Sequence, residues 1–105
     1  MIYKVYLDHK LHRKIIQFYE MALRLHSALD EETVQKKMQR IYEGVEKLRQ
    51  YAPIYRKARL LSEWIEAGYR ECIVEDFHFA FQIYKNEEGV AFVYVHDACH
   101  SFLYH

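Results

Sequence analysis

The chain has 105 residues, of which 51% are hydrophobic and 16% aromatic. This composition excludes general disorder, and the length suffices for a single core, so we treat residues 1–105 as one domain. No apolar run approaches about 18 residues and no charged leader precedes an apolar stretch, which predicts a cytoplasmic protein without a membrane segment. The two cysteines, Cys72 and Cys99, fit a reducing compartment better than a disulfide framework.

The formal net charge is zero, but the charges are unevenly distributed along the chain. Residues 1–59 carry 13 Lys or Arg and 7 Asp or Glu, whereas residues 60–105 carry 2 and 8. The first part is therefore suited to face a polyanion such as nucleic acid, and the second part is not.

Residues 1–7 are rich in β-branched and aromatic side chains and predict a first strand. Asp8 follows as a candidate helix N-cap. Apolar residues then recur at steps of three and four, the spacing of an amphipathic helix: Leu11, Ile15, Phe18, Ala22, Leu25 and Leu29.

Asp30 and the two acids after it predict the start of a second helix, because acids favour a first turn. Its apolar positions are Val34, Met38, Ile41, Val45 and Leu48. Pro53 disfavours helical backbone at the residue before it, so this helix is expected to end near residues 51–52. The two helices are expected to form a hairpin.

Each predicted helix also carries a basic stripe. The basic residues are Lys10, Arg13, Lys14 and Arg24 on the first helix, and Lys36, Arg40 and Lys47 on the second. Charged helix positions are most often ordinary solvated faces. The alternative is a nucleic-acid surface, favoured because the two stripes belong to consecutive helices with few acids among them.

The stretch from residue 51 to residue 67 gives a mixed signal. The segment "ARLLSEWIEAG" fits a short helix closed by Gly68, or an ordered loop anchored by Leu60 and Trp64.

Residues 69–75, 77–84 and 90–96 predict three strands separated by hairpin turns at residues 75–76 and 86–89. In the second of them, Phe77, Phe79, Phe81 and Ile83 share one face, and His78, Ala80, Gln82 and Tyr84 share the other. The expected fold is α+β, with the order β-α-α-(short α)-β-β-β and a helix hairpin packed on a small antiparallel meander.

The last eleven residues, "VHDACHSFLYH", combine three histidines with aromatic and apolar residues. Chain ends are usually frayed and rarely carry such side chains. These residues either pack as a strand end or build a site.

The order of elements and the stretch from Gly68 onward resemble the RelE/ParE superfamily of bacterial toxins, and most closely its YafQ-type mRNA interferases. The matching motifs are "GYREC" at residues 68–72, Asp76-Phe77 at a hairpin turn, and "HSFLY" at residues 100–104. Leu60, Ser62 and Trp64 partly match an upstream element of that branch. The motif match covers about the last 45 residues, and the first part matches only in element order.

The resemblance implies the toxin of a type II toxin–antitoxin system, a ribosome-dependent endoribonuclease that cleaves mRNA without a metal or cofactor. It implies that His100 is a general acid or base and that Asp76 is the acidic group beside it. Tyr104 is expected to stack on a base, and Phe77 to contact RNA. Arg70 is a candidate phosphate contact on chemical grounds.

Two positions depart from the YafQ-type pattern, because Ala58 and Ile73 stand where histidines are expected. This favours a second hypothesis, a ParE-type toxin that poisons DNA gyrase without catalysis. A third is an inactive homologue that serves as an antitoxin-binding module. For each residue the alternative is structural: a strand-end histidine at position 100, a turn-forming aspartate at 76 and an edge-covering tyrosine at 104.

No metal site is expected. The pairs His96/His100 and His9/His12 provide two ligands each, fewer than a zinc site requires. The expected partners are a cognate antitoxin, the ribosome and mRNA, and a second copy of the chain in a homodimer. The antitoxin is expected to place a helix in an apolar groove or to add a strand to a sheet edge.

Overall fold

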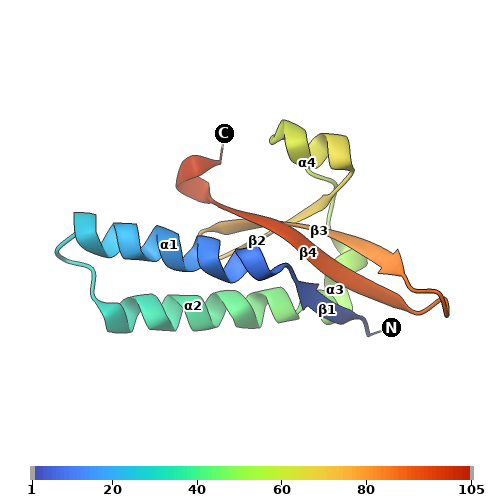
Figure 1. The fold of residues 1–105 in the computed structure, drawn as a ribbon, viewed down its shortest axis with the longest axis horizontal. Coiled ribbons are helices and arrows are strands. Elements are labelled where there is room, and N and C mark those ends of the chain that lie inside the picture. The colour runs from blue at the N-terminus through green and yellow to red at the C-terminus, as the bar shows by residue number, and fades with distance from the viewer. Residues whose placement is uncertain (1, 105) are drawn as a thin grey trace.

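A mixed four-stranded sheet organises the fold in the computed structural model, which describes residues 2–104 (Figure 1). Its strands are β1 (Lys4–Leu7), β2 (Arg70–Val74), β3 (Phe77–Lys85) and β4 (Ala91–His100), in the order β1-β4-β3-β2. β2, β3 and β4 form the predicted antiparallel meander, and β1 is parallel to β4. The α+β class is confirmed, and the first strand completes the sheet.

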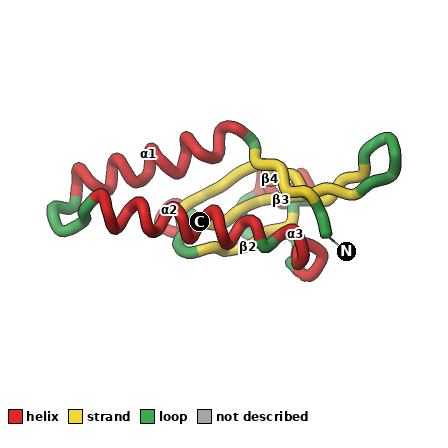
Figure 2. The backbone as a smooth tube through the Cα atoms, turned by 90° about the horizontal axis from the view of Figure 1, so that it is seen from below, coloured by secondary structure: helices red, strands yellow, loops and turns green. Residues whose placement is uncertain are grey.

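The predicted helix hairpin is formed by α1 (His9–Leu25) and α2 (Glu31–Glu46). Figure 2 shows the two helices side by side, joined by a loop at the end far from the N-terminus. The predicted cap is present, because the Asp8 side chain accepts a hydrogen bond from the Lys10 amide. Asp30, where the second helix is expected to start, caps that helix by accepting a hydrogen bond from the Thr33 amide. The first helix ends four residues before Leu29, which packs against the core from the loop.

The second helix is shorter than predicted. α2 ends at Glu46 and is followed by α3 (Leu48–Tyr51) and the short 3₁₀ helix η1 (Ala52–Ile54). Leu48 is buried, so the apolar pattern continues through the break at Lys47.

The alternative of a short helix is the correct one for the mixed segment. α4 (Ser62–Ala67) ends at Gly68, which has a φ of 73° and so adopts the left-handed conformation that favours glycine. Trp64 is buried and anchors α4, whereas Leu60 is exposed.

The two faces of the sheet bury different sets of side chains. On the hairpin side, Phe77, Phe79 and Phe81 join α1 and α2 in the main core. On the other side, Ala80 packs against Trp64 under α4. The predicted alternation along β3 is therefore confirmed.

The third predicted strand continues further than expected, since β4 runs to His100 rather than ending at His96. The β3–β4 register shifts between Ala80 and Phe81, which pair with Asp97 and Val95, so His96 is the extra residue of a β-bulge. The 3₁₀ helix η2 (Ser101–Leu103) follows. Met1, the first residue of the predicted first strand, and His105, the last histidine of the tail, lie outside the described residues.

Across residues 2–104, no helix combines the length and apolar character needed to cross a bilayer.

Candidate functional site

The structure brings Asp76 and His100 to one pocket. A cavity of about 330 Å³ lies between the second half of α1, the β2–β3 turn and η2, and it is largely apolar. Its polar groups are Lys37 of α2, Asp76 of the turn, His100 at the end of β4, and His26 after α1. We call this cavity the tail pocket.

His100 is held on three sides. Its ring stacks on Phe18, with centroids 3.7 Å apart and planes 16° apart, and meets Phe77 edge-on at 5.1 Å. The Phe102 amide donates a hydrogen bond to Nδ1 at 3.0 Å, so in this arrangement the ring proton is on Nε2. Burial lowers the pKa of His100 below its ordinary value, with Asp76 opposing and Lys37 reinforcing the shift.

Asp76 forms an ion pair with Lys37, whose Nζ lies 3.0 Å from Oδ2. Its backbone carbonyl accepts a hydrogen bond from the Ser101 amide at 2.7 Å, which ties the β2–β3 turn to the start of η2. The pocket therefore combines a carboxylate, an ammonium and an imidazole. Sequence analysis missed Lys37, although a helix period from Val34 and Ile41 places position 37 at the edge of the apolar face.

Tyr19 also lines the tail pocket, and sequence analysis did not select it. Its hydroxyl is buried and has no hydrogen-bond partner among the described residues. Burial, together with the negative charges of Asp76 and Glu75, raises the pKa of Tyr19 to about 12. The hydroxyl is thus a neutral donor with an unused hydrogen.

Tyr104 does not join this pocket. Its ring stacks on His78 at 3.7 Å, beside Trp64, under the α4 side of the sheet. Its hydroxyl donates to both carboxylate oxygens of Glu71, at 2.7 and 2.8 Å. Tyr104 therefore lies on the opposite side of the sheet from Asp76 and His100.

Glu71 and His78 form a polar cluster that sequence analysis missed. His78 is 8% exposed, and its Nδ1 lies 2.9 Å from the Glu71 carboxylate. Burial and the Glu71 carboxylate raise the pKa of Tyr104 to about 12. The signal available in the sequence was the strand alternation that turns His78 to the same face of β3 as Ala80, the α4 side of the sheet.

Arg70 lies at the opposite end of β2 from the tail pocket, in register with Phe81 in the middle of β3. Its guanidinium donates to the carbonyl oxygens of Tyr55, at 2.6 Å, and Pro53, at 3.4 Å. These bonds hold the loop after α3 against the sheet. The structure thus gives Arg70 a structural contact and no place beside His100.

Phe77 is 2% exposed and belongs to the core, where it also forms part of the lining of the second cavity described below. The two expected histidine positions also lie apart from the tail pocket. Ala58 is buried beside Trp64, and Ile73 is 62% exposed on β2.

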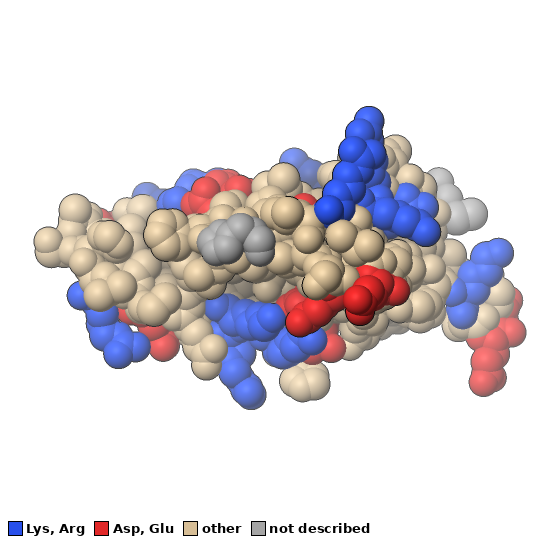
Figure 3. Space-filling model, turned by 90° about the horizontal axis from the view of Figure 1, so that it is seen from above, with Lys and Arg blue, Asp and Glu red and all other residues tan. Residues whose placement is uncertain are grey.

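The basic residues of the two helices are mostly exposed, but several are paired. Lys14 bonds Asp97 at 2.5 Å, Arg40 pairs with Glu75 and Lys36 pairs with Glu32. The remaining predicted contacts Lys10, Arg13 and Lys47 are exposed. Lys and Arg are interspersed with acids over much of the face in Figure 3, and the end formed by the helix tips is largely uncharged there.

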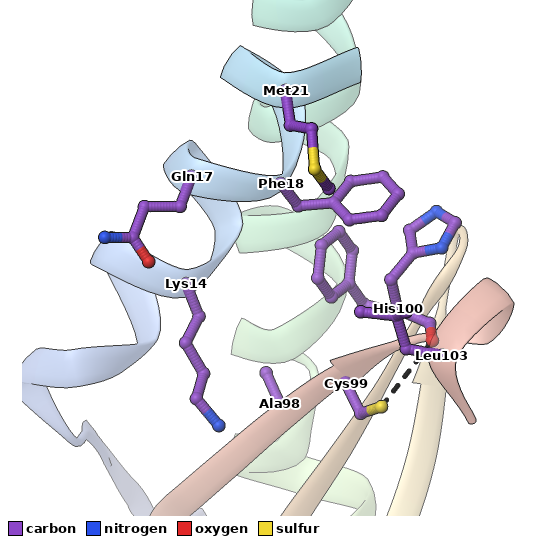
Figure 4. Close-up of a pocket in the computed structure, with 9 residues that line it drawn as sticks. Lys14, Gln17, Phe18, Met21, Ala98, Cys99, His100 and Leu103 are labelled. Atoms are coloured by element: carbon purple, nitrogen blue, oxygen red, sulfur yellow. Dashed lines mark hydrogen bonds between the residues drawn. The ribbon is translucent and has the colours of Figure 1, made fainter. Parts of the chain in front are cut away.

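A second cavity of about 370 Å³ adjoins the first and shares Phe18, Met21 and His100 with it. Figure 4 shows the His100 imidazole beside the Phe18 ring at one side of this cavity, with Lys14 reaching in from α1. His100 therefore separates two adjoining hollows, both lined mainly by apolar side chains.

Asp97 links three elements on the far side of this region. It accepts hydrogen bonds from Lys14 of α1 and from the Trp64 indole of α4, at 3.1 Å. Although burial opposes ionisation, these donors hold the pKa of Asp97 below its ordinary value.

Among residues 2–104, no group of three or more His, Cys, Asp or Glu side chains is arranged to hold a metal ion. Comparison of the chain with protein-family models, with curated proteins and with solved structures found no match.

Proposed function

We propose that the protein is the toxin of a type II toxin–antitoxin system and that it cleaves RNA in the tail pocket. The observation that carries this proposal is the set of three groups around one cavity: the Asp76 carboxylate, the Lys37 ammonium and the His100 imidazole. The sequence resemblance to the RelE/ParE superfamily supplies the substrate class.

Metal-independent RNA cleavage requires a base, an acid and a cation. In the proposed reaction Asp76 accepts the proton of the ribose 2′-hydroxyl, and the 2′-oxygen attacks the adjacent phosphorus. Lys37 stabilises the negative phosphorane. His100 donates a proton from Nε2 to the leaving 5′-oxygen, which gives a 2′,3′-cyclic phosphate and a 5′-hydroxyl.

This role requires His100 to be cationic, which means that Nδ1 must take up a proton and release the Phe102 amide. Because the pKa of His100 is lowered by burial, the cationic fraction grows as the pH falls below the ordinary value of 6.5. Cleavage is therefore expected to accelerate from about pH 8 towards about pH 6.

The test is induced expression in bacteria with growth and mRNA integrity as readouts. Wild type should arrest growth and cut mRNA, and His100→Ala should reduce cleavage by about 10²–10⁴-fold. His9→Ala is the matched control, because the side chain of His9 is 94% exposed at the other end of α1. Full mRNA cleavage by His100→Ala would contradict the proposal.

A ParE-type toxin that acts by binding is the second candidate. It is favoured by the hydrogen bond that keeps the His100 ring neutral and by the structural bonds of Arg70 and Tyr104. In that case DNA replication should stop before translation, and His100→Ala should remain toxic.

The partner of either toxin is a cognate antitoxin. The apolar side chains bordering the tail pocket and the adjoining cavity are its proposed contact, since Phe102 is 80% exposed, Leu25 is 71% exposed and Leu103 is 55% exposed. An amphipathic helix laid along α1 would cover them and close the pocket. An inactive homologue would retain this contact and lack toxicity.

A further inference from the structure

Half of the outer face of the sheet, the face turned away from the helix hairpin, is not covered by a helix. α4 packs over the end near the tail through Trp64 and Ala80. The β3–β4 hairpin extends beyond α4, and β1 lies along its edge (Figure 1). Strand alternation turns Val93 and Val95 into the core, so their neighbours Phe92 and Tyr94 point to this outer face.

Aromatic rings from four segments of the chain meet on this open half. We call the set the aromatic face, and its members are Tyr6, Tyr69, Tyr84, Phe92, Tyr94 and His96. Aromatic residues of β4 are paired with aromatic residues on both neighbouring strands. Phe92 pairs with Tyr84 of β3, and Tyr94 pairs with Tyr6 of β1.

The rings form one connected array. Tyr6 meets Phe92 edge-on with centroids 5.6 Å apart, and Phe92 meets Tyr84 at 5.7 Å. Tyr84 meets His96 at 5.8 Å, and His96 stacks on Tyr69 at 4.5 Å with planes 12° apart. The β-bulge that makes His96 an extra residue places its ring between these neighbours.

Hydrogen bonds of two tyrosine hydroxyls hold the array in place, and its rings remain accessible to solvent. The Tyr84 hydroxyl bonds His96 Nε2 at 2.8 Å, and the Tyr94 hydroxyl donates to Asp8 at 3.0 Å. Tyr6 is 47% exposed and Tyr84 is 38% exposed. Rings held in this way offer π-faces without losing further side-chain freedom on binding.

Two lysines beside the array can contact a polyanion. Lys4 shares a face of β1 with Tyr6, and the charges of Lys10 and Asp8 both lie near His96. Neither lysine forms an ion pair with another of the described residues. The nearby carboxylate of Asp8 is occupied by the Tyr94 hydroxyl and the Lys10 amide.

We propose that the aromatic face binds single-stranded nucleic acid, with bases stacked on the rings and with Lys4 and Lys10 contacting phosphates. Stacking platforms on open sheets bind unpaired bases because every base has a π-face, and flanking cations track the backbone. The site is distinct from the tail pocket, since His100 pairs with Phe77 on the hairpin side of the sheet. Binding here requires no cleavage and does not depend on the proposed reaction.

The test measures fluorescence anisotropy of a labelled 12-nucleotide oligo(U), an oligo(dT) of equal length and a duplex, in EDTA. Wild type should bind both single strands more tightly than the duplex. The comparison of oligo(U) with oligo(dT) shows whether the aromatic face prefers RNA or DNA. Phe92→Leu and Tyr6→Ala should each weaken binding by about 5–100-fold, the loss expected for one stacked base. Lys4→Gln should weaken binding to both strands and reduce the slope of log Kd against log salt by about 1.

Tyr51→Ala is the matched control, because Tyr51 is 48% exposed on α3, outside the array. Because DNA lacks the 2′-hydroxyl that the proposed reaction requires, binding of oligo(dT) measures the aromatic face separately from cleavage. For wild type, NMR should show upfield shifts of the Tyr6 and Tyr84 ring protons when oligo(U) is added, which requires no variant. Equal binding of the duplex, equal losses with Tyr51→Ala, or unshifted ring protons at saturation would overturn the proposal.

Discussion

At His100, a backbone amide decides which ring nitrogen is available for chemistry. The Phe102 amide occupies Nδ1, and the position of Phe102 is set by η2, which Tyr104 anchors on the opposite side of the sheet. A residue that sequence analysis assigns to base stacking thus fixes the conformation of the tail. Its hydroxyl acts on the imidazole only through the backbone between them.

Tyr104→Phe tests this arrangement. The change removes the two hydrogen bonds to Glu71 and leaves the stacking on His78. We expect a loss of about 1–2 kcal/mol in the free energy of unfolding, since these bonds reach a charged acceptor. NMR ¹⁵N shifts of His100 should move toward a mixture of tautomers. An unchanged tautomer would mean that η2 holds its place without Tyr104.

The lowered pKa of His100 predicts a pH dependence of stability. The unfolded chain binds a proton more readily than the folded chain below about pH 6.5, so stability should fall as the pH decreases through that range. The pKa of His96 is also lowered by burial, which adds to the loss. His100→Asn keeps an acceptor for the Phe102 amide and does not titrate.

Urea denaturation at about pH 7.5 and about pH 5.5 measures this effect. The loss of unfolding free energy on acidification should be smaller in His100→Asn than in wild type. Equal losses in the two proteins would show that His100 does not contribute.

Among the elements, α2 and β2 approach so closely that one glycine decides their spacing. A Cβ added to Gly44 would lie 2.3 Å from Cγ1 of Val74. The helix therefore crosses the strand at a position that excludes any larger residue. Glycine here lowers helix propensity and permits the hairpin to pack on the sheet.

Gly44→Ala is expected to destabilise the fold by about 1–3 kcal/mol, because overpacking exceeds the gain in helix propensity of about 0.5–1 kcal/mol. Val74→Ala removes the methyl groups that the new Cβ would meet. The double variant should therefore be less destabilised than the sum of the two single variants, as measured by urea denaturation. If the two losses of unfolding free energy were additive, the cost of Gly44→Ala would not come from contact with Val74.

The elements that sequence analysis predicts best are those with local signals. Asp8 and Asp30 mark helix starts through side-chain carboxylates that accept backbone hydrogen bonds, and Gly68 marks a helix end through its left-handed backbone. The extension of β4 to His100 is different in kind. It depends on a bulge at His96 that keeps the strand paired with β3, and a bulge depends on the partner strand rather than on local sequence.

For the whole molecule, the sequence predicts the α+β class and the hairpin-on-sheet packing, but not which side chains meet at the site. Asp76 and His100 come together because the β2–β3 turn and the end of β4 are adjacent in the meander. Lys37 joins them only through the placement of α2, and Tyr104 leaves them because η2 turns it to the other face. Such contacts depend on tertiary packing, which periodicity does not encode.

In the whole molecule, the two sides of the sheet have different proposed roles. The hairpin side carries the pocket proposed for cleavage, and the outer side carries the aromatic face proposed for binding single strands. Loss of cleavage in the tail pocket should leave binding at the aromatic face measurable, so the two proposals can be tested separately.

The most direct measurement is the chemistry of RNA ends produced by the purified protein on ribosome-bound mRNA in EDTA. The ribosomes are assembled with their Mg²⁺, and the EDTA is kept below that concentration so that it removes only trace transition metals. We predict 2′,3′-cyclic phosphate and 5′-hydroxyl ends from wild type, with a rate reduced by about 10²–10⁴-fold in His100→Ala and unchanged in His9→Ala. Intact RNA with wild type, or equal cleavage by His100→Ala, would contradict the assignment of the tail pocket as a nuclease site.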